Sequence, residues 1–311
     1  MTLKPFSFTA SHLVSMDQLR REDVEVIFRR AQDLETNLFP LPREKFSNRV
    51  LAPLFFEPST RTRLSFEVAM LRLGGQVLKL PEIHDLSLSK GETLEDTLRV
   101  LGAYADLIVL RHSTEEAVEL ACRYSPVPII NAGNGCDEHP TQALLDLYTI
   151  QKEKGRIDGL KIAVVGDLKH ARTIHSLLKG LAKFKADVFL VSPSELRAPE
   201  ALLKKFEDQG LTYLETPDIQ SVLGEADVLY TVMLQHHRIP DPQTVEQLKK
   251  RYYVIDRKLV QQAKPDLIIL HPMVRRDELP PEVDELPQAA YFRQVKNGVS
   301  VRMALLDLML G

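Results

Sequence analysis

The chain has 311 residues, 44% of them hydrophobic, which is enough for two domains of ordinary size, each with its own core. Its 40 Lys and Arg residues and 43 Asp and Glu residues give a formal net charge of −3, so the composition argues against a nucleic-acid partner and leaves room only for a local anion site. No apolar run approaches the roughly 20 residues that span a bilayer, and the opening segment MTLKPFSFTASH lacks the apolar centre of a secretory signal, so we expect a cytoplasmic protein with no membrane partner.

The first predicted element is a helix near the N-terminus. Ser15, followed three residues later by Gln18, has the pattern of a capping box, in which each side chain accepts from the other residue's backbone N–H. The pattern therefore predicts a helix that is capped by Ser15, with an apolar face made of Leu19, Ile27, Ala31 and Leu34.

Short apolar or β-branched runs then alternate with amphipathic stretches of helical spacing. The runs lie at 49–56, 106–110, 127–131, 161–167, 187–192, 227–232 and 266–272. This alternation predicts strand–helix–strand units, and therefore an α/β fold in which mostly parallel sheets are flanked by helices. The pattern restarts at 161–167 after a long helical stretch at 141–155, so we place the boundary between two α/β domains inside that helix. The final stretch, 297–311, predicts an apolar terminal helix that must pack on another element.

The segment FFEPSTRTRLS at 55–65 places hydroxyl and guanidinium groups where a strand ends and a helix begins. Apolar residues at helical spacing follow it as far as Gly74, so the S-T-R-T run at 59–62 lies at the N-terminus of the predicted helix. A helix N-terminus offers free backbone N–H groups and the positive end of the helix dipole, both of which suit a phosphate. Helix capping beside solvated arginines is the simpler interpretation of Ser-Thr alone, but five consecutive hydroxyl and arginine residues favour a phosphate site.

The same segment resembles the phosphate-binding motif of the aspartate/ornithine carbamoyltransferase family. The resemblance extends over nearly the whole chain, through LRHS at 110–113, NAGNGCDEHPTQALLDL at 131–147, GDLKHARTIHSLLKGL at 166–181 and YFRQVKNGVSVRMALL at 291–306. Ornithine-specific members carry an H-C-L-P motif with a catalytic cysteine, whereas this chain has Met273 after His271 and Pro272. The resemblance is therefore to the aspartate-specific branch.

The resemblance implies transfer of the carbamoyl group of carbamoyl phosphate to the amine of L-aspartate, giving N-carbamoyl-L-aspartate and phosphate in pyrimidine biosynthesis. It also implies a carbamoyl phosphate-binding domain over 1–145, an aspartate-binding domain over 146–291, and a terminal helix over 292–311 that packs back on the first domain. The chain would form homotrimers with shared active sites. No metal or organic cofactor is expected, because positioning and oxyanion stabilisation can drive the attack of the amine.

By the same resemblance, the first domain would hold carbamoyl phosphate. The residues that would cradle its phosphate are Ser59, Thr60, Arg61 and Thr62. Arg111 would bridge the phosphate and the carbonyl oxygen, His139 would donate to that oxygen as it becomes an oxyanion, and Gln142 would hold the carbamoyl NH2 group. The segment SLSKGETLEDT at 87–97 resembles a loop that reaches into the neighbouring subunit's site with a lysine, which here would be Lys90.

In the second domain, the resemblance assigns Arg172 to the α-carboxylate of aspartate and Gln235 to a polar contact near it. It places Pro272 and Met273 in a loop beside the substrate amine. Arg238 and Glu57 match a pair that joins the two domains of the family in their closed form.

The acceptor half of the predicted site departs from the family pattern at two positions. Met233 stands where the family has an arginine for the β-carboxylate of aspartate. The family also reads H-P-L-P-R, with a Leu-Pro peptide that is commonly cis, where this chain has Met273 and Val274. A cis peptide before a residue other than proline costs about 2.5–4 kcal/mol, so we expect a trans peptide here, with its carbonyls aimed differently. Both departures predict weak aspartate binding.

Two alternatives remain open at this stage. The first is a carbamoyltransferase for a different amine acceptor, since the phosphate half is intact and the acceptor half is altered. The second is a non-catalytic homologue that acts as an assembly partner, although such a chain would be expected to lose the S-T-R-T run, Lys90 or His139. The sequence does not say whether regulatory chains or a dihydroorotase bind to the trimer.

Overall fold

The computed structural model describes residues 8, 11–36, 46–80 and 86–311. The chain divides into two compact units. The first unit consists of Met1–Leu145 together with Lys296–Gly311, and the second consists of Asp146–Val295. Two helices, α5 (Pro140–Lys154) and α11 (Tyr291–Leu310), therefore run from one unit into the other.

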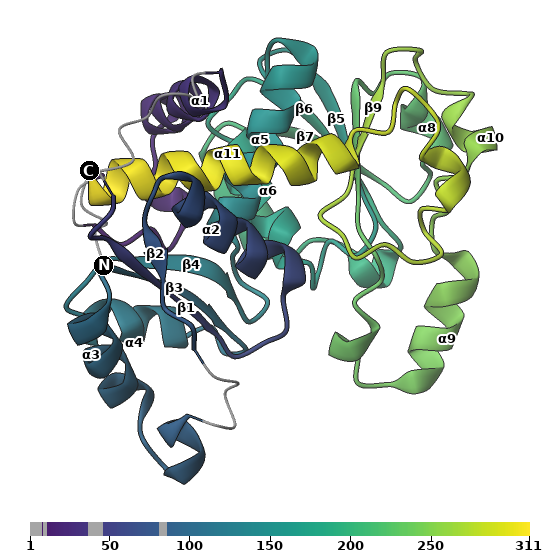
Figure 1. The fold of residues 1–311 in the computed structure, drawn as a ribbon. Coiled ribbons are helices and arrows are strands. Elements are labelled where there is room, and N and C mark those ends of the chain that lie inside the picture. The colour runs from purple at the N-terminus through teal and green to yellow at the C-terminus, as the bar shows by residue number, and fades with distance from the viewer. Residues whose placement is uncertain (1–7, 9–10, 37–45, 81–85) are drawn as a thin grey trace. The chain divides into compact units, whose positions relative to one another are not determined.

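The first unit is built on a parallel sheet of four strands in the order β2-β1-β3-β4 (Figure 1). The strands are β1 (Val50–Phe55), β2 (Gln76–Val77), β3 (Leu107–His112) and β4 (Ile129–Asn134). Leu54 pairs with Leu110, and Ile108 pairs with Ile129, so apolar residues of neighbouring strands lie side by side. Such strands are covered on both faces, which is why they read as continuous apolar runs in the sequence.

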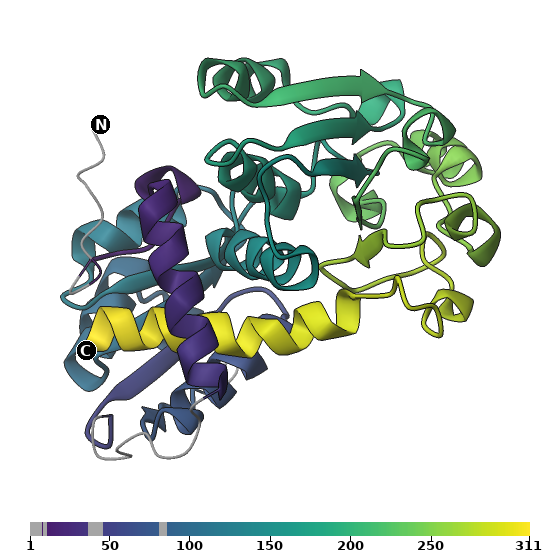
Figure 2. The same cartoon turned by 90° about the horizontal axis from the view of Figure 1, so that it is seen from above.

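Helices cover both faces of this sheet. They are α1 (Arg21–Thr36), α2 (Thr60–Arg72), α3 (Leu94–Tyr104) and α4 (Ala117–Tyr124), with the 3₁₀ helix η3 (Ser87–Lys90) before α3. Leu98 and Leu101 of α3 join Val118 and Ala121 of α4 in one core with the strands. On the other face, α1 lies beside the C-terminal part of α11 (Figure 1) and crosses it when seen from above (Figure 2).

The terminal helix packs on the first unit, as predicted. Arg30 of α1 donates from Nε to Oδ2 of Asp307 at 2.6 Å, which ties α1 to α11. The Arg302 guanidinium lies 5.1 Å from the ring centroid of Phe66, which ties α11 to α2. These contacts join the end of the chain to the helix that begins with the S-T-R-T run.

The capping box at Ser15 is present, but the predicted helix start was wrong. The box closes a short 3₁₀ helix, η1 (Met16–Gln18), in which Ser15 Oγ accepts from Asp17 N and Gln18 Oε1 accepts from Ser15 N, both at 3.0 Å. The chain is extended at Leu19, so α1 begins only at Arg21. Three of the four predicted apolar residues face the core from α1, whereas Leu19 is buried outside it.

The second unit contains a parallel sheet of five strands in the order β7-β6-β5-β8-β9 (Figure 2). The strands are β5 (Lys161–Val165), β6 (Asp187–Val191), β7 (Thr212–Thr216), β8 (Val228–Thr231) and β9 (Ile268–Leu270). The helices are α6 (Arg172–Leu181), α7 (Glu200–Asp208), α8 (Gln220–Leu223), α9 (Pro242–Arg251) and α10 (Arg257–Val260). Two parallel sheets flanked by helices confirm the predicted α/β fold.

Within the described part of the chain, no helix is both long and apolar enough to cross a bilayer. Neither Cys122 nor Cys136 forms a disulfide bond with a described residue, and both side chains are partly buried. The described residues also contain no group of three or more His, Cys, Asp or Glu side chains that could hold a metal ion.

Candidate active site

Each sheet has one point at which the strand order reverses, and the predicted site residues follow the strands at these points. In the first sheet the reversal lies between β1 and β3, because β2 is beside β1 and β4 is beside β3. The S-T-R-T run follows β1, and Arg111 lies near the end of β3. Open parallel sheets bind their ligands beyond the carboxyl ends of the strands at such a reversal. The topology therefore supports a ligand site where the sequence predicts one.

The S-T-R-T run begins α2, as predicted. Ser59 occupies the N-cap position, but its side chain makes no capping hydrogen bond within the described structure. The simpler interpretation of this segment, helix capping by Ser59, is therefore wrong. The hydroxyl and the N–H groups of the first turn remain suited to an anion.

The two arginines of the run differ in their contacts. Arg63 donates from Nε to Oε1 of Glu67, one turn along α2, at 2.9 Å. By contrast, the guanidinium of Arg61 forms no hydrogen bond or ion pair with a described residue, and partial desolvation lowers the pKa of this group. Arg61 is therefore the arginine that can bind a phosphate without first giving up a carboxylate.

Thr62 and His139 bring two polar groups together from distant parts of the sequence. Thr62 Oγ1 lies 3.3 Å from His139 Nε2, and both residues are buried. His139 immediately precedes Pro140, the first residue of α5, and its backbone carbonyl accepts from Gln142 N at 3.0 Å. The start of α5 thus fixes His139 and Gln142 on the same turn.

Hydrogen bonds of Glu138 hold the turn that precedes His139. Glu138 is 2% exposed, and its carboxylate accepts from Ser15 Oγ and, at 3.0 Å, from Met16 N. Its backbone N donates to Asn134 Oδ1 at 3.2 Å. The N-terminal segment therefore helps to position His139, a role for Glu138 and Ser15 that the sequence analysis missed.

Arg111 lies where β3 ends, beside the S-T-R-T run. Its Nη1 donates to the carbonyl of Ala132 at 3.2 Å, and its Nε lies 3.2 Å from Oε2 of Glu57. Both contacts hold the guanidinium near the start of α2. The pairing of Glu57 with Arg238 would join the two units and stays a prediction.

Lys90 is the one predicted residue of the first unit that lies apart from the others. It ends η3, a helical turn that projects beyond the start of α3 and away from the sheet (Figure 1). Its side chain is exposed. The structure of one chain therefore does not bring Lys90 to the S-T-R-T run.

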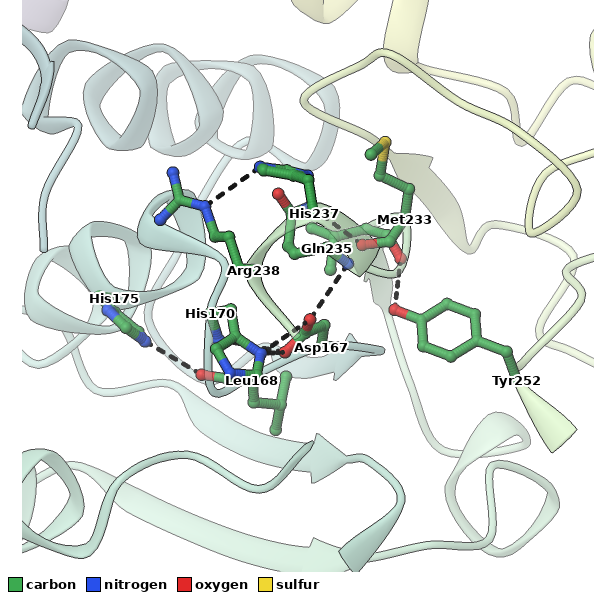
Figure 3. Close-up of polar contacts among 10 residues, drawn as sticks. Asp167, Leu168, His170, His175, Met233, Gln235, His237, Arg238 and Tyr252 are labelled. Atoms are coloured by element: carbon green, nitrogen blue, oxygen red, sulfur yellow. Dashed lines mark hydrogen bonds and ion pairs between the residues drawn. The ribbon is translucent and has the colours of Figure 1, made fainter. Parts of the chain in front are cut away.

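In the second unit the strand order reverses between β5 and β8, and Asp167 joins the two segments that follow these strands. Asp167 is fully buried, and its Oδ2 accepts from Gln235 N at 3.1 Å (Figure 3). Its Oδ1 accepts from His170 N at 3.0 Å. Gly166, at φ +123°, leaves room for Tyr252 to pack beside this turn, because a Cβ there would lie 2.4 Å from Tyr252 Oη. Sequence reasoning missed Asp167, although an acidic residue just after a predicted strand was a usable signal.

The side chains predicted to contact the carboxylates of the acceptor lie on these two segments. Arg172 is the first residue of α6 and is 7% exposed. Gln235 donates from Nε2 to the Met233 carbonyl at 3.0 Å, and Arg238 donates from Nε to His237 Nε2 at 3.3 Å (Figure 3). Met233 itself is half-buried. The side chains predicted to bind aspartate thus lie in this unit. Position 233 offers them a thioether and no positive charge.

The loop after β9 corrects one expectation. The Met273-Val274 peptide is cis, not trans as predicted from the absence of proline. The prediction used only the local preference of the peptide bond, whereas the loop is also held by a hydrogen bond from Met273 N to Nδ1 of the buried His271. Arg275, next along the loop, donates to Asp284 and lowers the pKa of that carboxyl.

Comparisons with known proteins agree with this arrangement. The family described as aspartate/ornithine carbamoyltransferase matches the chain twice, through its carbamoyl-P binding domain over residues 11–152 and its Asp/Orn binding domain over residues 158–309. The chain is 49% identical over 305 residues to the aspartate carbamoyltransferase catalytic subunit of Methanopyrus kandleri, covering 98% of this chain and 99% of that one. It is 46% identical over 301 residues to the corresponding subunit of Methanocaldococcus jannaschii, covering 96% and 97%.

Solved structures give the same result. An aspartate transcarbamoylase from Trypanosoma cruzi in complex with carbamoyl aspartate and phosphate superposes with a TM-score of 0.93 at 39% identity, covering 100% of both chains. The same enzyme in complex with carbamoyl phosphate and aspartate gives a TM-score of 0.93 at 40% identity, covering 99% of this chain and 100% of that one.

Proposed function

Because the chain belongs to the aspartate/ornithine carbamoyltransferase family, we propose that it carbamoylates L-aspartate with the residues described above. The reaction joins the carbamoyl group of carbamoyl phosphate to the amine of L-aspartate and releases phosphate. The observation that carries the proposal is the first turn of α2, where Arg61 has no carboxylate partner among the described residues and Thr62 contacts His139. We place the enzyme in the cytoplasm, in pyrimidine biosynthesis.

The first unit binds and activates carbamoyl phosphate. Its phosphate lies at the N-terminus of α2, held by the backbone N–H groups there, by Ser59 and Thr60, and by Arg61. The carbonyl oxygen faces Thr62 Oγ1 and His139 Nε2, which lie 3.3 Å apart and can both donate to one oxygen. Loss of one such donor typically costs about 2.7–4 kcal/mol of transition-state stabilisation.

Arg111 and Gln142 complete this half of the site. Arg111 reaches between the phosphate and the carbonyl oxygen, and Gln142 holds the carbamoyl NH2 group, which fixes the direction of attack. As the new C–N bond forms, the bond from the carbonyl carbon to the phosphate oxygen breaks. The leaving phosphate takes up the proton that the amine loses, so no metal or further base is required.

The second unit binds aspartate. Arg172, at the N-terminus of α6, pairs with the α-carboxylate, and the positive end of that helix dipole adds to the attraction. Gln235 adds a polar contact, and the carbonyls of Pro272 and Met273 accept hydrogen bonds from the amine. Glu57 and Arg238 pair when the enzyme closes over its substrates.

A homotrimer with shared active sites is part of this proposal. Leu64, Val68 and Leu71 form an exposed apolar stripe along α2, with exposed fractions of 51%, 37% and 60%. Such a stripe, beginning beside the phosphate site, is typical of a surface that a second copy covers. Lys90 then reaches the S-T-R-T run of a neighbouring chain, because it projects away from its own. Regulatory chains or a dihydroorotase are further candidate partners of the trimer.

Mixed trimers test the sharing of sites. We expect Arg61→Ala and Lys90→Ala chains to be nearly inactive alone and to regain about a quarter of the unmodified activity when mixed equally, because every mixed trimer contains one intact site. The measurement is N-carbamoyl-L-aspartate formation after reversible dissociation and mixing, with each variant mixed with itself as the control. Confirmed mixed trimers that stay inactive would contradict sharing.

A different amine acceptor is the second candidate function, and Met233 is the observation that favours it. If aspartate is the acceptor, Met233→Arg should lower its KM about tenfold to a hundredfold, as expected for a charge-assisted hydrogen bond of about 1.5–3 kcal/mol to the β-carboxylate. Met233→Leu, which keeps an apolar side chain of similar size, is the control and should leave KM nearly unchanged. An unchanged KM in both variants, together with rapid carbamoylation of another amine, favours the second candidate.

The experiment that tests the proposed function is steady-state kinetics of the unmodified chain. Phosphate release from carbamoyl phosphate should depend on L-aspartate and should match N-carbamoyl-L-aspartate formation one to one. Release that is independent of every amine, or no release at all, would contradict an aspartate carbamoyltransferase.

A further inference from the structure

In the proposed mechanism, the carbonyls of Pro272 and Met273 face the substrate amine. The loop that carries them begins at a buried histidine. His271 follows β9 and is 1% exposed, and Glu278, at the other end of the loop, is 4% exposed. The imidazole bridges the two, because Nε2 lies 3.0 Å from Glu278 Oε1 and Nδ1 lies 2.8 Å from Met273 N. One side chain thus contacts both the middle and the far end of the loop.

These contacts fix the tautomer of His271. A backbone N–H can only donate, so Nδ1 must present its lone pair to Met273 and the ring proton must lie on Nε2. Nε2–H then donates to Glu278. Burial raises the pKa of the Glu278 carboxyl, but hydrogen bonds from His271 and from Arg276 N outweigh burial and lower it, so this acceptor stays ionised at neutral pH.

A buried series of hydrogen bonds within the second unit holds the backbone of His271 in place. Its backbone N donates to Gln294 Oε1 at 2.9 Å, and Gln294 Nε2 donates to Asp146 Oδ1 at 2.6 Å. Tyr230 Oη donates to Asp146 Oδ2 at 2.9 Å. The ring therefore takes its position from β8, α5 and α11, which are rigid elements on which the loop can be held.

We propose that His271 is a positioning residue for the carbamoyl transfer, acting through its Nδ1 hydrogen bond to Met273 N. This proposal rests on the proposed function, because the loop it orients carries the carbonyls of Pro272 and Met273 that face the substrate amine. Glu278 supports this contact indirectly, because it accepts the hydrogen bond from His271 Nε2–H and thereby keeps the ring proton on Nε2. Neither residue touches the substrate.

Two substitutions separate this role from a purely structural one. In His271→Asn, Oδ1 takes the place of Nδ1 and can still accept from Met273 N, but nothing reaches Glu278. In His271→Gln, Nε2 takes the place of the ring Nε2 and can still donate to Glu278, but the acceptor for Met273 N is gone. Each variant thus removes one of the two contacts described above and keeps the other.

The proposal predicts opposite kinetic results for the two variants. His271→Gln should raise the KM for L-aspartate about tenfold, the effect of one lost hydrogen bond, and should lower kcat. His271→Asn should keep both within about threefold. Carbamoyl phosphate affinity, measured by calorimetry, should be unchanged in both, because its residues lie in the first unit. Equal losses in the two variants, or a larger loss in His271→Asn, would overturn the proposal.

A measurement on the unmodified protein keeps the proposal testable if either variant fails to fold. Nitrogen-15 NMR of labelled histidine should show the ring proton of His271 on Nε2 and a lone pair on Nδ1. A proton on Nδ1 would overturn the proposal. If the unmodified chain does not carbamoylate aspartate, the proposed function fails, whereas the NMR result still reports on the contact.

Discussion

Replacement of Arg61 by alanine is expected to abolish carbamoyl phosphate binding at usable concentrations while the chain stays folded. A guanidinium paired with a phosphate contributes about 3 kcal/mol or more, so the Kd should rise at least about a hundredfold. Stability should hardly change, because Arg61 has an exposed side chain and no ion-pair partner among the described residues. Calorimetry with carbamoyl phosphate and thermal unfolding measure the two effects.

Arg63→Ala is the matched control for this prediction. It removes the same charge two residues along α2, but its guanidinium is already bound to Glu67. A partly exposed pair one turn apart on a helix contributes only about 0.3–0.5 kcal/mol to helix stability, so Arg63→Ala should stay folded. It should bind carbamoyl phosphate nearly normally, because the Arg63 guanidinium is already bound to Glu67. Equal losses from both substitutions would mean that net charge, not a phosphate ligand, explains the result.

His139→Ala should lower kcat by about two to three orders of magnitude, the effect of removing one oxyanion donor. Carbamoyl phosphate should still bind, because the S-T-R-T run and Arg111 hold its phosphate. Single-turnover rates combined with carbamoyl phosphate affinity separate the chemical step from binding.

His112→Ala is the control for this second prediction. His112 lies next to Arg111, but its Nδ1 accepts from Thr114 N at 3.1 Å within its own turn. We expect its removal to change kcat only about threefold or less. If His139→Ala keeps most of its activity, or if both substitutions lower kcat equally, His139 is not the oxyanion donor.

The fold could be predicted where the local sequence decides it. All seven apolar runs form strands, because both faces of their sheets are covered and the runs are therefore continuous, at the edge strands β4 and β9 as well. Two strands of the described part of the chain were missed. β2 has only two residues, and β7 lies at the edge of its sheet with Leu214 55% exposed, so neither gives an apolar run.

The site could be predicted only in part, for a similar reason. The S-T-R-T run acts through the start of its own helix, so its position follows from neighbouring residues. Asp167 and Glu278 act on groups 68 and 7 residues away in the sequence, through contacts that only the fold creates. The Met273-Val274 peptide was predicted wrongly because contacts with His271, not the local preference of the peptide bond, hold that loop.

A competition between amine acceptors tests the proposed function most directly. The unmodified chain is incubated with carbon-13-labelled carbamoyl phosphate and an equimolar mixture of L-aspartate, L-ornithine and other amino acids, and the labelled products are identified by mass spectrometry. We expect N-carbamoyl-L-aspartate as the main enzyme-dependent product, and we expect that product to be lost with Arg61→Ala. A different carbamoylated amine as the main product, or no product above the enzyme-free background, would contradict the proposed function.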